Sequence, residues 1–434
     1  MFDDLHTRRL FISRGMTVLS AATTLPAFLE STGRALANTR DASTGKTRKS
    51  DHRIFVVVQL GGGNDGLSTV IPVDNDDYRR ARPRLAINRN LLSLGRGSGL
   101  ALHPNMTGMK SLFDAGHLSV VLGAGYPNPN RSHFRSMAIW QTAQPAIEAN
   151  HGWLGRYFDN QCCGADPVTP EAAVNVGPTS PMALHGKEFS SVSFMNPAAF
   201  QWLPGSRKTL FSRRMHSIYD ELNGISGHPE AVLAGQDSLN FLQRVALDAH
   251  LAGADIRHAT DDFHNAVPYP DSDLGRSLAN VAKMIHADLP TTVYYVSMGG
   301  FDTHANEKSR HDKLMKDLSD ALTSFINDLK AQGNLDRTLV MTFSEFGRRV
   351  AENASGGTDH GTAAPMFLMG GSIRPGLLGV EPSLSPAHLD HGDLRFTVDF
   401  RTVYASVLKD WLHTDAQAIL NGRFKTLPIL AGRS

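Results

Sequence analysis

A nearly continuous apolar run of mostly β-branched residues, Ile54–Leu60 (IFVVVQL), constrains the fold more than any other segment. A strand with one wet face alternates apolar and polar residues, whereas a strand buried on both faces is apolar throughout. Four more short apolar runs follow, at 118–122, 292–298, 339–343 and 366–369. The chain is therefore expected to build a central sheet that is covered on both faces.

Segments with helical periodicity lie between and after these runs. They span 229–256, 274–287, 308–332 and 396–412. Strands that alternate with helices predict an α/β fold, with a mostly parallel central sheet and helices on both faces. We predict a single domain over residues 53–434, with a helical and loop-rich insertion at about 160–290.

The first 37 residues have the features of an export signal. Paired arginines, Arg8 and Arg9, precede an uncharged stretch and a small-residue cleavage motif at 35–37. The arginine pair resembles a twin-arginine signal, and the apolar stretch is shorter than the roughly 20 residues of a membrane span. We expect a signal peptide at 1–37, a polar linker at 38–52, and a periplasmic or secreted protein without a membrane span. An uncleaved anchor or a chance arginine pair is the alternative.

The composition gives no indication of nucleic-acid binding and is rich in histidine relative to cysteine. The 43 Lys and Arg residues balance 42 Asp and Glu residues, so no basic excess predicts nucleic-acid binding. The two cysteines, Cys162 and Cys163, are adjacent in the sequence, and adjacent cysteines rarely satisfy disulfide geometry. The 19 histidines remain, and their positions relative to the predicted strands carry the functional argument.

Polar clusters stand next to all five apolar runs. In a parallel α/β sheet, ligands bind beyond the carboxyl ends of the strands. The candidates are Asp65 after the first run, Arg131, Ser132 and His133 after the second, Asp302 and His304 after the third, Glu345 after the fourth, and Asp359 and His360 before the fifth. Carboxylate and imidazole ligands together suit Zn, Mn or Fe.

Most of these clusters also have a purely structural interpretation. Asp65 could cap a turn, Ser132 could cap a helix that begins near Phe134, and Glu345 could be an acid favoured at a helix N-terminus. Asp302 and His304 are two residues apart, so both side chains could reach one ion from an extended chain. No single cluster is decisive without the others.

Five motifs in this order, GGGNDG, NRSHFRSM, GGFDTH, TFSEFGRR and GTDHGTAAPMFLMGG, carry a family resemblance. They resemble a bacterial exported family known as domain of unknown function fifteen-oh-one, which is similar in fold to the alkaline phosphatase and sulfatase superfamily. The resemblance covers nearly the whole chain after the signal. It implies an alkaline-phosphatase-like domain with metals at the strand ends around a nucleophile.

Carried over residue by residue, the resemblance implies roles for the strand-end clusters. Asp65 would be the first-strand metal ligand, and Asp302, His304 and His360 would bind one metal. Ser132 would be the nucleophile, beside His133, and Arg131 would bind the ester oxygens. Glu345 stands where superfamily members usually carry Asp-His, so Phe346 replaces a metal-binding histidine. The sulfatase Cys-x-Pro-x-Arg signature is absent.

Two functional hypotheses follow from the sequence. The first is an exported hydrolase of a phosphate or sulfate ester that depends on a divalent metal, Zn or Mn, and is delivered by the twin-arginine export machinery. The second is a non-catalytic periplasmic binding or envelope-assembly protein with a degenerate site. The first hypothesis expects Asp65, Asp302, His304, Glu345 and His360 to converge within a few ångströms, with Asp359 as a further ligand candidate.

Overall fold

A computed structural model describes residues 52–161, 168–195, 253 and 256–432 of the chain. The predicted signal peptide, all but the last residue of the predicted linker, and Cys162 and Cys163 lie outside these ranges. So does nearly all of the helix predicted at 229–256.

A nine-stranded sheet forms the centre of the described protein, with the strand order β11-β5-β10-β9-β1-β8-β6-β7 and with β12 paired to β5. The strands are β1 (Ile54–Leu60), β5 (Leu118–Gly125), β6 (Ala173–Val176), β7 (Val192–Phe194), β8 (Val293–Met298), β9 (Thr338–Ser344), β10 (Ala364–Gly370), β11 (Gly376–Leu378) and β12 (Val398–Asp399). The five strands predicted from apolar runs are β1, β5, β8, β9 and β10. A separate small sheet contains β2 (Val70–Pro72), β3 (Leu92–Ser93) and β4 (Leu100–Leu102).

Strand direction confirms the prediction of a mostly parallel sheet. β1 runs parallel to both β8 and β9, and β6 runs parallel to β7 and β8. β10 is antiparallel to its two neighbours, β5 and β9, so β5 points the same way as β9. The carboxyl ends of β1, β5, β8 and β9 therefore meet at one edge, which is also where β10 begins. This geometry gathers the five polar clusters.

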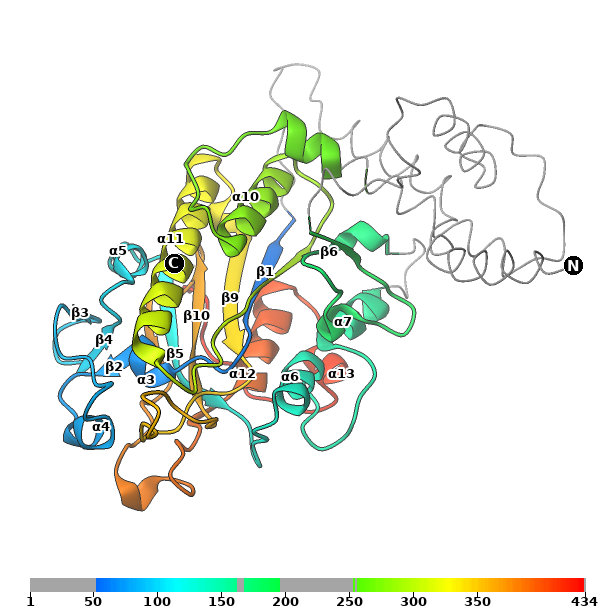
Figure 1. The fold of residues 1–434 in the computed structure, drawn as a ribbon. Helices are drawn as coiled ribbons and strands as arrows, with labels where there is room; N and C mark the ends of the chain where they lie inside the picture. Colours follow the sequence, from blue (N-terminus) through cyan, green and yellow to red (C-terminus); the bar gives the residue numbers. More distant parts are fainter. Residues whose placement is uncertain (1–51, 162–167, 196–252, 254–255, 433–434) are drawn as a thin grey trace, which may run out of the picture.

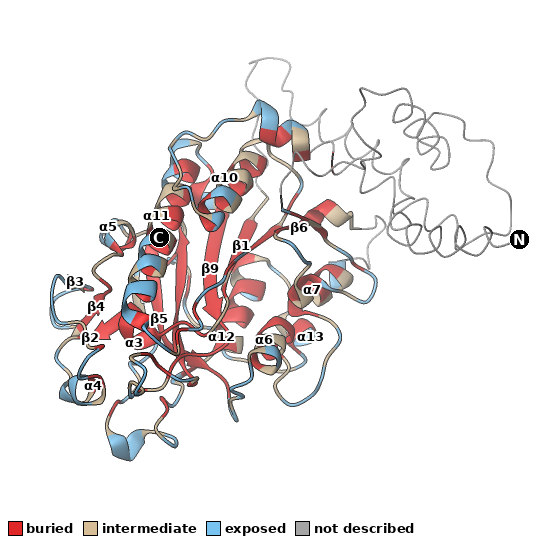
Figure 2. Ribbon diagram, viewed as in Figure 1, coloured by how far each residue is buried: buried red, intermediate tan, exposed pale blue. Residues whose placement is uncertain are grey.

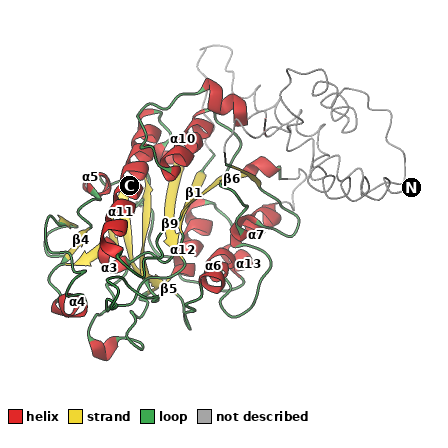
Figure 3. Ribbon diagram, viewed as in Figure 1, coloured by secondary structure: helices red, strands yellow, loops and turns green. Residues whose placement is uncertain are grey.

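Helices cover both faces of the sheet, as Figures 1 and 3 show. The helices are α3 (Gly66–Thr69), α4 (Asp76–Ala81), α5 (Thr107–Asp114), α6 (His133–Thr142), α7 (Trp153–Gln161), α10 (Asp273–His286), α11 (Glu307–Ala331), α12 (Phe400–Ser406) and α13 (Ala416–Leu420). Helices α5, α10 and α11 pack on one face, whereas α6, α7, α12 and α13 pack on the other. A π-helical turn, Val407–Trp411, extends α12 over most of the helix predicted at 396–412.

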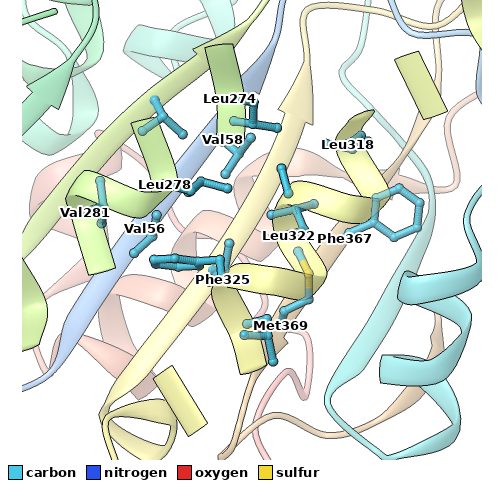
Figure 4. Close-up of a cluster of buried hydrophobic side chains, with 14 of the residues drawn as sticks. Val56, Val58, Leu274, Leu278, Val281, Leu318, Leu322, Phe325, Phe367 and Met369 are labelled. Atoms are coloured by element: carbon cyan, nitrogen blue, oxygen red, sulfur yellow. The ribbon is translucent and has the colours of Figure 1, made fainter. Parts of the chain in front are cut away.

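The alternating side chains of β1 explain why this strand is apolar at every position but Gln59. Val56 and Val58 point into the core under α10 and α11, while Phe55 and Val57 point into the opposite core. Figure 4 shows the first of these cores, where Val56 and Val58 meet residues of α10, α11 and β10. Both faces exclude water, and Figure 2 shows the central strands as buried. The one polar side chain of this strand, Gln59, accepts hydrogen bonds from Gln141 and Tyr295.

The described part of the predicted insertion at 160–290 contributes to the same body. β6 and β7 extend the central sheet beyond β8, and α10 packs against α11 on the sheet. Residues 196–252 lie outside the described ranges, so the insertion stays a prediction. In the ranges that the structure describes, no helix combines the length and apolar character needed to cross a membrane.

Candidate functional site

Three side chains from different segments converge at the carboxyl edge of the sheet. His133 is the first residue of α6, Asp302 lies in the loop after β8, and His360 lies in the loop before β10. One ligand atom from each, two imidazole nitrogens and a carboxylate oxygen, lies within 4.8 Å of the others. We call these three residues the His–Asp group. Asp302 Oδ1 is at its centre, 3.5 Å from His133 Nε2 and 3.3 Å from His360 Nε2.

The carboxylate of Glu345 orients the ring of His133. Glu345 Oε1 lies 2.8 Å from His133 Nδ1 and also accepts a hydrogen bond from the backbone N–H of Gly62. A carboxylate accepts, so His133 Nδ1 carries the proton and donates it. The Nε2 atom of His133 is then a lone-pair donor, and it is buried without a hydrogen-bond partner in the described structure.

His360 is oriented in the same way by a backbone carbonyl. Its Nδ1 lies 2.8 Å from the carbonyl oxygen of Arg131. A carbonyl can only accept, so Nδ1–H donates and the second nitrogen, Nε2, faces Asp302. Burial lowers the pKa of His360, which favours the neutral ring. Two imidazole nitrogens and one carboxylate oxygen therefore face each other, which is a set of atoms able to hold a metal ion.

Asp302 is held in its ionised form. Burial alone would raise its pKa, but the hydrogen bond and the positive charge of Arg348 outweigh burial and lower the pKa to about 2. The guanidinium of Arg348 is fully buried and donates from Nη2 to Asp302 Oδ1 at 2.7 Å. Other nitrogens of Arg348 donate to the carbonyl oxygens of Gly63 and Thr358. Arg348 therefore ties three loops to the His–Asp group.

Two glycines after β1 allow these loops to approach one another. Gly62 has a φ of +117°, and a Cβ built there would lie 2.5 Å from the backbone nitrogen of Asp302. Gly63 has a φ of +76°, and a Cβ there would collide with the ring of Phe346. Any larger residue at either position would separate β1 from the loops that carry Asp302 and Phe346.

Of the remaining predicted residues, His304 and Glu345 lie next to the His–Asp group. His304 Nδ1 is 2.9 Å from Asp302 Oδ1, and its ring packs against that of His360. Its side chain is 44% exposed, so it contacts Asp302 from the solvent side. Glu345 is only 2% exposed and is engaged by His133, Gly62 and the hydroxyl of Ser344. Glu345 thus contacts the His–Asp group from the protein interior, through its hydrogen bond with His133.

The structure places Asp65 outside the His–Asp group. Its two carboxylate oxygens bind the guanidinium of Arg82 at 2.5 and 2.9 Å, and both side chains are fully buried. The paired charge of Arg82 holds the pKa of Asp65 below its usual range against the opposing effect of burial. This buried pair anchors the β1 loop, because Arg82 also donates to the carbonyl oxygens of Arg349 and Val350.

The remaining predicted residues surround the group at the surface. Ser132 occupies the N-cap position of α6, but its exposed side chain makes no capping hydrogen bond. The guanidinium of Arg131 binds the buried carboxylate of Asp393. Asp359 is exposed, and its Oδ1 accepts from Asn353 rather than facing His360. The hydroxyl of Ser132 therefore makes no hydrogen bond to the backbone N–H groups at the start of α6.

Three residues that matter here escaped the sequence analysis. Arg348 sits in the TFSEFGRR motif, but nothing in the motif indicates which arginine turns inward. Arg82 follows Asp65 by 17 positions, beyond any helical or strand repeat. Asp393 lies in a loop with no regular pattern, and its role depends on the distant Arg131. Only three-dimensional contacts identify these partners.

Fold and site together define an α/β protein with two oriented histidines and an aspartate at the carboxyl edge of a mostly parallel sheet. The chain belongs to the family described as "Protein of unknown function (DUF1501)", whose model matches residues 52–413. This finding confirms the resemblance given by the five motifs. A search of the curated proteins finds no match.

Three solved structures show a distant similarity to this chain. One is a protein in the alkaline phosphatase superfamily from Vibrio parahaemolyticus, with 8% identity, 77% of this chain and 64% of that chain covered, and a TM-score of 0.35. The lipoteichoic acid synthase LtaP from Listeria monocytogenes has 9% identity, 75% and 67% coverage, and a TM-score of 0.32. The PsFucS1 sulfatase from Pseudoalteromonas sp. has 11% identity, 83% and 70% coverage, and a TM-score of 0.32. Similarity at this level transfers no activity to this chain.

Proposed function

We propose that this protein is an exported hydrolase that uses one divalent metal to cleave a phosphate or sulfate ester. The observation that carries the proposal is the His–Asp group, in which two oriented imidazole nitrogens and one carboxylate oxygen face each other. Two histidines and one carboxylate form a ligand set suited to Zn or Mn.

The hydrogen bonds behind the ligands support a metal site. Metal-binding histidines typically donate their second ring N–H to a carboxylate or a carbonyl. His133 donates to the Glu345 carboxylate, and His360 donates to the Arg131 carbonyl. The buried, unpartnered Nε2 of His133 fits the same assignment. His133, Asp302 and His360 would hold the metal, which would act as a Lewis acid toward an ester oxygen.

The residues around the group suit an anionic ester. The bound metal would supply the positive charge that attracts a phosphate or sulfate group, because the charge of the buried Arg348 is paired with Asp302. The predicted nucleophile is Ser132, whose hydroxyl is exposed and precedes His133 in the chain. In the proposed reaction, Ser132 Oγ bonds to phosphorus or sulfur and loses its proton to solvent. The ester bond breaks, the leaving alcohol takes up a proton, and water then releases the serine.

The burial of Asp65 favours the second candidate function, a non-catalytic binding protein. Two metals would clamp the attacking and leaving oxygens of such a transfer, but Asp65 is committed to Arg82 and Phe346 fills a ligand position. A single metal that binds an anionic ligand without cleaving it would satisfy the same geometry. The two functions differ in whether the bound ester is cleaved.

The location of the protein is also a proposal. The paired arginines, the uncharged stretch and the cleavage motif at 35–37 support delivery to the periplasm or the exterior by the twin-arginine machinery. The absence of a basic excess supports an ester substrate rather than a nucleic-acid partner.

A panel of phosphate and sulfate monoesters, incubated with protein reconstituted with Zn or Mn, tests the proposed activity. We expect turnover of at least one ester class and its loss in Ser132→Ala, with metal content unchanged in that variant. Asp359→Asn is the control, because this exposed carboxylate faces away from the group. Stoichiometric metal without turnover of any ester would favour the binding protein instead.

A further inference from the structure

A pocket of about 230 Å³ lies next to the His–Asp group. Its walls include Tyr126 at the end of β5, Phe346 after β9, and Leu394 and Phe396 from the loop before β12. The ring of Phe346 also packs against His133 and His360, with ring centroids 4.9 and 4.7 Å apart. One aromatic side chain is therefore a wall of the pocket and a neighbour of both histidines.

The inner wall of this pocket is apolar because its polar atoms are already engaged. The hydroxyl of Tyr126 shares a hydrogen bond with Ser136 and accepts another from the backbone of Asn130. The hydroxyl of Thr362, another lining residue, donates to the carbonyl of Leu394. What remains toward the interior is aromatic and aliphatic carbon.

The outer part of the pocket is different. Asp390 and Arg395 also line it, and both residues are exposed. Charges of both signs beside an apolar interior match an occupant with an apolar face and a more polar outer edge. They do not match a long hydrocarbon chain, which would have to continue past these charges.

The volume restricts the occupant further. An apolar cavity of about 150 Å³ in another protein holds one benzene molecule. A pocket of about 230 Å³ thus holds one substituted six-membered ring but not two. Aromatic walls such as Phe346 and Phe396 favour a flat or nearly flat ring, because ring faces pack together.

We propose that this pocket binds the leaving group of the ester, and that the leaving group is a single-ring alcohol. The assignment rests on the proposed function, since it places the ester bond beside Phe346 at the His–Asp group. Both aromatic and saturated six-membered rings have the required shape, and the experiment separates them.

The test compares phosphate monoesters of three primary alcohols with equal numbers of carbon atoms: benzyl, cyclohexylmethyl and n-heptyl. Equal carbon counts and similar leaving groups isolate the effect of shape. We expect kcat/KM to be at least about tenfold higher for one or both ring esters than for the n-heptyl ester. Benzyl above cyclohexylmethyl would identify an aromatic ring, and the reverse order a saturated ring. Equal kcat/KM for all three esters would overturn the pocket assignment and leave the proposed hydrolase intact.

Variants of Phe396 test the pocket itself. Phe396→Ala removes one wall, and Phe396→Leu keeps apolar bulk so that the fold is preserved. We expect both to reduce the preference for ring esters and to weaken the binding of benzyl alcohol or cyclohexylmethanol to metal-free protein, measured by calorimetry. Phe424→Ala is the matched control, because Phe424 is also half-buried but packs against Arg401 and does not line the pocket.

The two readouts separate the possible failures. Unchanged ring preference and unchanged alcohol binding in the Phe396 variants, with Phe424→Ala like the parent protein, would overturn the pocket assignment. Alcohol binding that depends on Phe396, in a protein that cleaves none of the esters, would contradict the proposed hydrolase and with it the leaving-group role.

Discussion

His133 Nδ1 and Glu345 Oε1 lie 2.8 Å apart, and this contact joins the start of α6 to the end of β9. It fixes which ring nitrogen of His133 carries a proton, and it leaves the other nitrogen facing Asp302. Glu345 is nearly fully buried and also holds the backbone N–H of Gly62. Glu345 therefore acts on the proposed metal site through His133 and not as a ligand.

Glu345→Gln is expected to lower the affinity for Zn or Mn by about 10–100-fold, the usual cost of losing a carboxylate behind a metal-binding histidine. Titration of metal-free protein with the metal and a competing chelator measures the change. Asp359→Asn, which removes a nearby exposed carboxylate, should leave the affinity unchanged. An equal loss in both variants would mean that general charge, rather than the orientation of His133, sets the affinity.

The Asp65–Arg82 pair leads to a prediction about stability. Arg82→Met leaves the fully buried carboxylate of Asp65 without its partner, so the free energy of unfolding should fall by about 3–5 kcal/mol. Urea denaturation followed by circular dichroism measures the change. Arg276→Ala breaks an exposed pair with Asp273 and should leave the free energy of unfolding almost unchanged. Similar losses in the two variants would contradict the structural role given to Asp65.

Glu307 should make stability depend on pH. Burial and then the nearby charge of Asp65 raise the pKa of Glu307 to about 8, while Thr358 donates a hydrogen bond to it. The folded protein therefore keeps a proton that the unfolded chain loses near pH 4.5. Stability should fall as the pH rises toward 8, by at most about 1.4 kcal/mol per pH unit.

The window from pH 6.5 to 8 isolates this effect. The lowered pKa values of Asp65 and of His311, about 4 for the latter, influence stability mainly below that window. Glu307→Gln keeps the size and removes the charge, so its unfolding free energy should change less over these pH values. Parallel curves for the parent protein and Glu307→Gln would refute the assigned pKa direction.

Export can be tested on the whole chain. Arg8→Lys combined with Arg9→Lys should retain the protein, with its uncleaved N-terminus, in the cytoplasmic fraction of a bacterial host. The parent protein should appear in the periplasmic or extracellular fraction, shortened at 35–37. Normal export of the double variant would contradict the twin-arginine assignment, and a full-length exported protein would indicate an anchor.

Much of the fold could be predicted because burial leaves a pattern in the sequence. The strand at Ile54–Leu60 matches its prediction at both ends, since a strand inside two cores is almost entirely apolar. The long helix α11 begins one residue before the predicted start and ends one residue before the predicted end. β6 and β7 were not predicted, because short strands near the sheet edge carry too few residues for a clear pattern.

The site was harder to predict because its assembly depends on contacts between distant segments. Parallel strands bring their carboxyl ends to one edge of a sheet. This rule predicted that four residues lie together, and they do: Asp302, His304, Glu345 and His360. The same rule pointed to Asp65, yet its side chain turns toward Arg82. A sequence shows that an acid follows a strand, but it does not show which cation or histidine that acid will meet.

The most direct test is the metal content of the purified, folded protein after dialysis with Zn or Mn, measured by mass spectrometry. We predict close to one metal per chain, lost when His133→Ala and His360→Ala are combined and retained in Ser132→Ala. Substoichiometric metal in the parent protein, or a double variant that is folded and still fully loaded, would contradict the account.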